Sequence, residues 1–147
     1  MSVENVELVR GLQPTEVDLV EVFRSEGAAE ALMAGAGDVP ISPDAVIEFV
    51  GGESALERAE YKGLEGLAEG WRVWLEGWDS QVIRLEELID AGRQVVALVR
   101  IKGRTTRHGV EVEHAPAAVW TIEDGTVVGI SFYLDRDQAF EAAGLEQ

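Results

Sequence analysis

Residues 110–134, VEVEHAPAAVWTIEDGTVVGISFYL, decide the fold, because apolar residues alternate with polar or small ones on both sides of an acidic turn. This alternation has the period of two that is typical of a half-buried β-strand. The segment Glu123–Asp124–Gly125 separates the two runs and provides the turn of a hairpin. The sequence therefore predicts two long antiparallel strands, Val110 to Ile122 and Val127 to Leu134.

The register of this hairpin follows from the requirement that neighbouring strands place their apolar side chains on one shared face. A two-residue turn at Asp124–Gly125 would divide the apolar residues between the two faces. A three-residue turn with Gly125 in the left-handed conformation instead pairs Trp120 with Val128. We expect this second register, which places the even-numbered side chains of both strands on one inner face.

Two more β-rich runs precede the hairpin, from Gln81 to Ile89 and from Gln94 to Lys102. Pairing Arg100 with Glu113 would set opposite charges face to face and turn the apolar residues of that strand toward the inner face. The cluster of basic residues from Arg93 to Arg107 could suggest an anion site. We expect these residues to pair with glutamates across the sheet instead.

The N-terminal half has a helical period. From Leu64 onward, apolar residues recur at intervals of three and four, which predicts a helix with one strongly apolar face. The residues of that face are Leu64, Leu67, Trp71, Trp74, Leu75 and Trp78. Shorter helices are expected within residues 3–9, 17–23 and 28–34, then a loop at 35–43, a strand at 45–50, and a final helix within 135–145, capped by Asp135 and ended by Gly144.

Helices followed by a meandering sheet are typical of the α+β class, and 147 residues suit one domain spanning 1–147. The net charge of −16 disfavours nucleic acid and anionic membranes as partners. The absence of cysteine excludes disulfides and thiolate chemistry. No signal peptide or membrane-spanning stretch is evident in the sequence, so we expect a cytoplasmic protein.

Several motifs share an order and spacing with a known family. They are the Tyr61–Lys62–Gly63 turn before the Trp-rich helix, the strand Ala118-Val119-Trp120-Thr121-Ile122, and the closing stretch from Phe132 to Leu145. Over nearly the whole chain, this combination resembles the SnoaL-like group of the nuclear-transport-factor-two-like superfamily. The resemblance implies a cone-shaped, curved, mixed or antiparallel sheet wrapped around N-terminal helices, with a short C-terminal helix. It also implies a deep apolar pocket and, often, a homodimer, for which we expect the outer face of the sheet to be used.

The resemblance also places the catalytic positions of three enzyme types on this sequence. The base of ketosteroid isomerases falls on Phe49, and the acid that these enzymes share in position with polyketide cyclases falls on Ala118. The Asp-Arg-Asp set of limonene epoxide hydrolases falls on Val99, Ile101 and Phe132. None of these five side chains ionises, so whether the chain is an enzyme stays open.

His114 is the one titratable side chain that the predicted register places in the pocket, so it is the best catalytic candidate. It could hydrogen-bond a carbonyl or phenol, or act as a general base near neutral pH. A lone histidine on an apolar strand face is also typical of a packed residue with one satisfied ring nitrogen. The full predicted pocket comprises Phe49, Trp71, Trp74, Val99, Ile101, His114, Ala118, Trp120 and Phe132.

Three functions remain open. The chain could bind an apolar, planar small molecule against its aromatic walls, catalyse an isomerase, cyclase or hydrolase reaction with His114 as base, or serve as a structural homodimerisation module with a filled cone. We expect no metal site, because His108 and His114 are separated by about 20 Å along a strand while Glu111 and Glu113 point to the other face. No cofactor motif is present, so no cofactor is expected.

Overall fold

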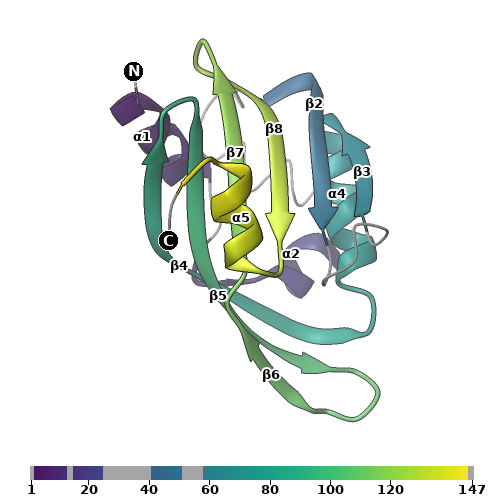
Figure 1. The fold of residues 1–147 in the computed structure, drawn as a ribbon. Coiled ribbons are helices and arrows are strands. Elements are labelled where there is room, and N and C mark those ends of the chain that lie inside the picture. Colours follow the sequence, from purple (N-terminus) through teal and green to yellow (C-terminus); the bar gives the residue numbers. More distant parts are fainter. Residues whose placement is uncertain (1, 13–14, 25–40, 51–57, 146–147) are drawn as a thin grey trace.

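The computed structural model describes residues 2–12, 15–24, 41–50 and 58–145. Within these ranges the chain forms an open, curved, eight-stranded sheet with helices on both faces (Figure 1). The predicted α+β class is confirmed. The elements are α1 (Ser2–Leu12), β1 (Val17–Asp18), α2 (Leu19–Arg24), β2 (Ile41–Val50), β3 (Arg58–Lys62), α4 (Gly63–Trp74), β4 (Trp78–Ala91), β5 (Gln94–Thr105), β6 (Glu111–His114), β7 (Ala117–Glu123), β8 (Thr126–Tyr133) and α5 (Arg136–Ala142).

The sheet has the strand order β1-β4-β5-β7-β8-β2-β3, and β6 pairs with the far end of β5. Consecutive strands from β4 to β8 form an antiparallel meander, as the short turns predicted. The pairing of β2 with β8 is parallel, which makes the sheet mixed. The strand that was expected at 45–50 is β2, and it lies between β8 and β3 in the same sheet.

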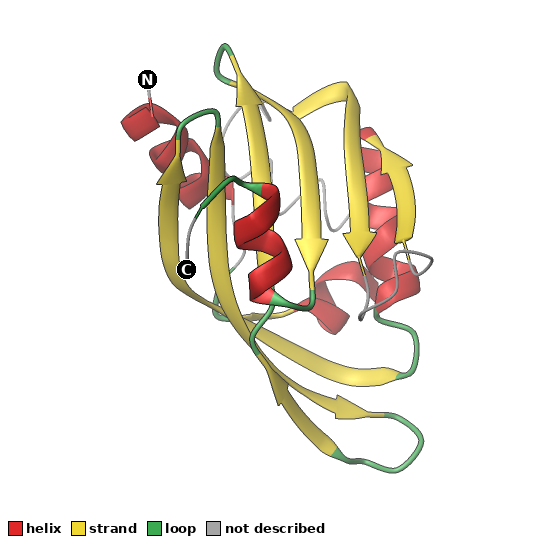
Figure 2. Ribbon diagram, viewed as in Figure 1, coloured by secondary structure: helices red, strands yellow, loops and turns green. Residues whose placement is uncertain are grey.

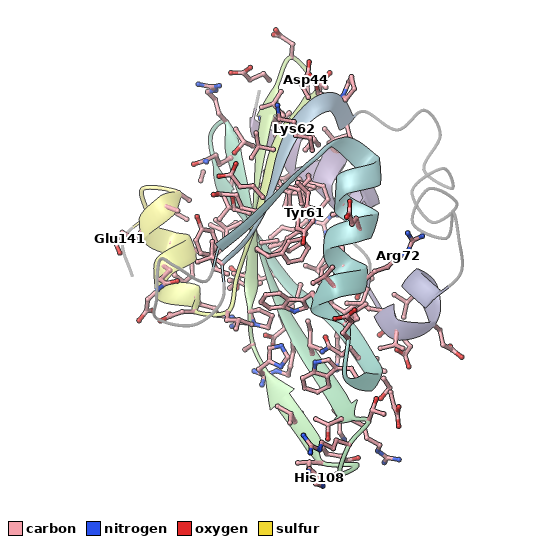
Figure 3. The ribbon with its side chains drawn as sticks, turned by 90° about the vertical axis from the view of Figure 1, so that its right-hand side faces the viewer. Asp44, Tyr61, Lys62, Arg72, His108 and Glu141 are labelled. Carbon is pink, nitrogen blue, oxygen red and sulfur yellow. The ribbon has the colours of Figure 1, made fainter. Side chains whose placement is uncertain are left out.

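Helix α4 covers one face of the sheet, and α5 lies against the opposite face (Figures 2 and 3). The predicted apolar stripe explains the position of α4, because Leu67, Trp71 and the C-cap residue Leu75 are all buried in the main core. The helix is shorter than predicted. It ends at Trp74, the turn residue Gly77 has a φ of 85°, and Trp78 is the first residue of β4.

The predicted register of the last hairpin is wrong by two residues. Trp120 pairs with Ile130 rather than Val128, because the turn contains only Asp124 and Gly125, both at positive φ (51° and 75°). A bulge between Thr121 and Ile122 shifts the pairing by one residue and so restores the parity that a plain two-residue turn would have lost. The shared inner face is confirmed, since Trp120, Ile130 and Phe132 pack in one cluster.

The strand predicted from Val110 to Ile122 is interrupted at Pro116, which has no backbone N–H to donate to a ladder. The two parts pair with opposite ends of β5. Here too the predicted register is shifted by two residues, because His114 lies opposite Ile101, and Glu113 lies opposite Lys102 instead of Arg100.

Ion pairs across the sheet confirm the expected pairing for three members of the basic cluster, Arg93, Arg100 and Arg104. Arg100 contacts Glu86 and Glu113 at 3.4 and 3.2 Å, and Arg104 contacts Glu111 at 3.4 Å. Arg93 pairs with Glu123 at the turn end of the sheet. These arginines have carboxylate partners already, so nothing in their arrangement calls for an external anion.

The centre of the outer face is covered by the chain itself. Four apolar side chains there, Val96, Leu98, Ala117 and Val119, pack in a second core cluster with Ala139 of α5. The predicted N-cap of α5 is confirmed, because Asp135 Oδ1 accepts a 2.8 Å hydrogen bond from the Asp137 backbone N–H. A second subunit would therefore meet α5 and the strands beside it, not the bare apolar centre that the sequence suggested.

Strand β3 was not predicted, because Arg58–Lys62 is short and rich in charge, as edge strands often are. The helix expected at 28–34 and most of the loop expected at 35–43 lie outside the described residues. Among the helices of the described ranges, none has the length and hydrophobicity needed to cross a bilayer.

Candidate functional site

The predicted pocket residues meet on the inner face of the sheet, beside α4, which packs against β2 and β3 (Figure 1). Eight of the nine line one cavity, here called the inner pocket. The ninth, Trp120, is only 1% exposed and packs in the core without lining it. The inner pocket is lined by Phe49, Trp71, Trp74, Ile83, Val99, Ile101, His114, Pro116, Ala117, Ala118, Phe132, Tyr133 and Leu134.

Aromatic side chains fill most of this inner pocket. Phe49 stacks on Phe132 with ring centroids 4.8 Å apart, and the edge of Trp71 meets both rings at 5.4 and 5.0 Å. Tyr61 contributes a further edge contact from β3, between the sheet and α4 (Figure 3). The remaining cavity has a volume of about 30 Å³, which is room for only one or two water molecules.

A second hollow, here called the outer groove, continues from the inner pocket toward solvent. It has a volume of about 430 Å³ and is lined by Trp74, Trp78, Gln81, Val112, His114 and Leu134. Trp74, His114 and Leu134 line both hollows, so they form the boundary between them. Leu134 is 39% exposed although it is apolar. The outer groove therefore offers the open apolar surface that the inner pocket lacks.

His114 ends β6 beside this boundary and is half-buried. Within the described residues, its ring makes no hydrogen bond and no ion pair. Burial lowers the pKa of His114 below its ordinary value, because the surrounding apolar groups solvate the charged imidazolium poorly. The ring is consequently neutral near pH 7, with one nitrogen available to accept and the other to donate.

Gln81 is the polar groove residue that sequence reasoning missed. It is 1% exposed, and its backbone N–H donates to Asp18 Oδ1 at 3.0 Å. Its side-chain Oε1 is buried and has no hydrogen-bond partner in the part of the chain that the structure describes. A signal was present, because Gln81 is two residues before the buried Ile83 and so lies in the inward phase of a strand.

The positions that match the catalytic residues of related enzymes all lie in the inner pocket. Phe49, Val99, Ile101, Ala118 and Phe132 line it together. None of the five can transfer a proton. Among the described residues that line either hollow, there is no aspartate, glutamate, lysine or arginine.

The remaining chemical candidates are dispersed. His108 lies in the turn at the tip of the β5–β6 hairpin, far out from the body of the protein (Figure 3). Glu111 and Glu113 point away from the groove and bond to arginines. No group of three or more potential metal-ligating side chains occurs in the part of the chain that the structure describes.

A larger hollow of about 890 Å³ lies at the other end of the sheet, between α1 and two hairpin turns. Its walls are mainly polar and include Glu4, Glu123 and Asp124. Arg93, which also lines it, is already paired with Glu123. This hollow lacks the apolar walls that are typical of small-molecule sites.

Comparison with solved structures shows the same fold in other proteins. A provisionally assigned SnoaL-like polyketide cyclase from Jannaschia sp. CCS1 superposes with a TM-score of 0.65 at 18% identity, covering 99% of this chain and 95% of that one. A nuclear-transport-factor-two-like protein from Burkholderia thailandensis E264 gives 0.64 at 21% identity, with coverages of 93% and 95%. TerC, co-crystallised with polyporic acid, gives 0.62 at 16% identity, with coverages of 96% and 98%.

No curated protein matched the chain. At the level of sequence families, the SnoaL-like domain matches residues 35–130, which is well over half of the chain. That match agrees with the structural relatives and with the motifs around the Trp-rich helix and the last two strands. The chain therefore belongs to the SnoaL-like domain family and has the nuclear-transport-factor-two-like fold.

Proposed function

We propose that the protein binds an apolar, planar small molecule in the outer groove, with one edge of the ligand directed toward the inner pocket. The observation that carries this proposal is the pair of half-buried tryptophans, Trp74 and Trp78, which line an open hollow of about 430 Å³. Hollows of roughly 300–1,000 Å³ with mainly apolar walls and a few polar groups are typical of small-molecule sites.

The fold and the family are consistent with this proposal. SnoaL-like proteins include small-molecule binders and polyketide cyclases, and the related TerC was crystallised with polyporic acid. Indole rings provide large flat surfaces, and stacking on them favours planar ligands over globular ones. The inner pocket supports only the edge of a ligand, since Phe49, Phe132 and Trp71 already occupy most of it.

Titration with naphthalene, followed by quenching of tryptophan fluorescence, tests the proposal. Val112 faces the groove from β6, so Val112→Trp should fill it and weaken binding at least about tenfold. Val110→Trp is the matched control, because Val110 is 52% exposed and does not line the groove. Absence of quenching in the wild type, or undiminished binding by Val112→Trp, would contradict the proposal.

A second candidate function is an isomerase, cyclase or hydrolase reaction with His114 as general base. The observation that favours it is a neutral, half-buried imidazole at the boundary of both hollows, with no partner among the side chains that the structure describes. Once a turned-over substrate is found, His114→Ala should reduce kcat by at least about a hundredfold. Unchanged turnover would exclude this role.

A homodimer through the outer face also remains a proposal. The strands β8, β2 and β3 lie beside α5 on that face and are not covered by it (Figure 1). Val46 of β2 is 39% exposed there, while Glu48 bonds Ser131 of β8. Sedimentation equilibrium should then give twice the chain mass of 16.0 kDa.

The cysteine-free composition remains compatible with the predicted cytoplasmic location.

A further inference from the structure

A buried polar atom without a partner lies at the floor of the outer groove. Gln81 is 1% exposed, yet its Oε1 has no hydrogen-bond partner among residues 2–12, 15–24, 41–50 and 58–145. Buried polar groups in folded proteins are almost always paired, because leaving one unpaired forfeits the bonds it made to water. Among the described residues nothing satisfies this amide oxygen, which leaves it available to a hydrogen-bond donor of a ligand.

The backbone around Gln81 aims this side chain into the groove. Val82, the next residue, is 45% exposed on the other face, while Ile83 lines the inner pocket. Across the sheet, Gln81 is opposite Gly103, which is opposite Val112 in β6. Because Gly103 has no side chain, the space that its Cβ would occupy is taken by the ring of Trp78, which lines the groove beside Gln81.

A hydrogen bond to Asp18 holds the backbone of Gln81 in place. Asp18 Oδ1 accepts hydrogen bonds from the backbone N–H groups of both Gln81 and Val20, each at 3.0 Å. The carboxylate thus ties β4 to the start of α2. A side chain held on a rigid strand with its backbone anchored can select a ligand without paying much ordering entropy.

The side chains that line the groove favour an uncharged ligand. No charged side chain lines it among the described residues, so neither a carboxylate nor an ammonium group would find a counter-charge. A hydroxyl group both donates and accepts, so it can bond either end of a carboxamide. The second polar group of the groove, His114, can also bond a hydroxyl.

We propose that Gln81 is a specificity-determining residue that selects uncharged, planar ligands bearing a hydroxyl group, such as phenols, over the same ring systems without one. This inference rests on the proposed function, because it requires a ligand in the outer groove. To the apolar, planar ligand of the proposed function, this inference adds a hydroxyl group. The hydroxyl would lie against the Gln81 amide, with the ring system between Trp78 and Trp74.

The test compares the dissociation constants of 2-naphthol and naphthalene. Formation of one hydrogen bond in a water-excluded site should favour 2-naphthol by about five- to tenfold in the wild type. Gln81→Leu should abolish this preference while retaining affinity for naphthalene. Gln94→Leu is the matched control and should keep the preference, because Gln94 bonds Thr121 at the distant end of β5.

Two further probes keep the test decisive if Gln81→Leu fails to fold. 2-Methoxynaphthalene has lost the O–H donor, and it should bind the wild type no better than naphthalene. 2-Naphthoate should bind at least tenfold more weakly than 2-naphthol, since the groove has no cation. Equal affinities for all four probes would overturn the role of Gln81 and leave the proposed binding function intact. A water molecule that stays bonded to the Gln81 amide when 2-naphthol is bound would have the same consequence. Failure of every probe to bind would overturn both proposals.

Discussion

Phe49 and Phe132 stack with their ring centroids 4.8 Å apart and their planes 25° from parallel, because the parallel pairing of β2 with β8 sets the two residues directly opposite each other. The family resemblance implies a catalytic position of ketosteroid isomerases at Phe49 and one of limonene epoxide hydrolases at Phe132. Here the stacked pair, closed by Trp71, forms a packed core. The proposed binding surface therefore lies further out, in the groove lined by Trp74, Trp78 and His114.

Removing one ring of this pair should reopen the inner pocket. Phe132→Ala is expected to lower the free energy of unfolding by about 2–4 kcal/mol, because a partly buried phenyl ring is lost and a cavity remains. The enlarged pocket should bind naphthalene more tightly. Urea unfolding and fluorescence titration measure the two effects.

Phe140→Ala is the control for that experiment, since Phe140 packs against the outer cluster on the other side of the sheet. It should cost stability without changing the affinity for naphthalene. Unaltered affinity in Phe132→Ala, despite the lost ring, would show that Phe132 does not close the pocket.

The lowered pKa of His114 predicts a dependence of stability on pH. The unfolded chain takes up a proton on this residue near its ordinary value of 6.5, while the folded protein resists protonation until a lower pH. Stability should therefore be lost as pH falls from 6.5 toward the folded pKa, and His114→Gln should flatten this part of the profile. Thermal unfolding across pH 4.5–7.5 measures it.

His108→Gln is the matched control, because His108 is exposed in the hairpin turn, and it should retain the wild-type slope. An unchanged slope in His114→Gln would mean that the ring gains a partner on folding and is not simply desolvated.

Glu86 links the C-terminal helix to the sheet. It accepts a 2.5 Å hydrogen bond from Arg136, which also donates to the Val99 carbonyl at 2.8 Å. The hydrogen bond from Arg136, together with attraction from Arg100 and Arg136 that outweighs burial, lowers the pKa of Glu86. A lowered carboxyl pKa stabilises the fold above about pH 4.5, and that stabilisation is lost as pH falls through the folded value.

Glu86→Gln should therefore be less stable than the wild type at pH 7, with a difference that shrinks at pH 3. Glu87→Gln removes the same charge one residue away, at an exposed position, and should have a smaller effect at both values. Chemical denaturation at the two pH values measures this. Equal losses in both variants would indicate a general charge effect rather than a specific contact with Arg136.

The absence of a side chain at Gly103 allows the indole of Trp78 to lie flat against β5. A Cβ there would come within 2.8 Å of Trp78 Cζ3 and 2.9 Å of the Ser80 carbonyl oxygen. Gly103→Ala should lower the free energy of unfolding by about 1–3 kcal/mol, displace the Trp78 ring and weaken naphthalene binding.

Gly129→Ala provides the comparison, since its nearest neighbour would be 3.5 Å away, an ordinary contact distance. Near-wild-type stability and binding are expected for it. If Gly103→Ala also retains near-wild-type stability and naphthalene affinity, Trp78 can move to make room for the added methyl group, and its close packing on Gly103 is not needed for binding.

The periodicity of the chain was enough to predict the α+β class and the shared inner face, on which eight of the nine predicted pocket residues line one cavity. The parity of the last hairpin survived a wrong register, because the period of two links every inward side chain to the others. The bulge at Val128 could not be predicted, since it depends on β8 having one more residue than β7 at this point of the pairing. The sequence also could not show that the pocket is nearly filled, because open and closed pockets contain the same residue types and differ in side-chain rotamers.

Gln81 shows a different limit. Its inward phase was available from the alternation of β4, but its importance depends on an atom that finds no partner, which only the packed structure reveals. Trp120 shows the reverse. It shares the predicted face with Phe132, yet Ile130 and its other neighbours bury it beyond the reach of any ligand in the groove.

The most direct test of ligand binding in the outer groove is an NMR titration with 2-naphthol that follows the indole N–H resonances of the four tryptophans. The resonances of Trp74 and Trp78 should shift with a common saturation curve, while that of Trp120 should stay in place. Saturable shifts confined to Trp120, or no shift at Trp74 and Trp78 at saturating 2-naphthol, would contradict binding there.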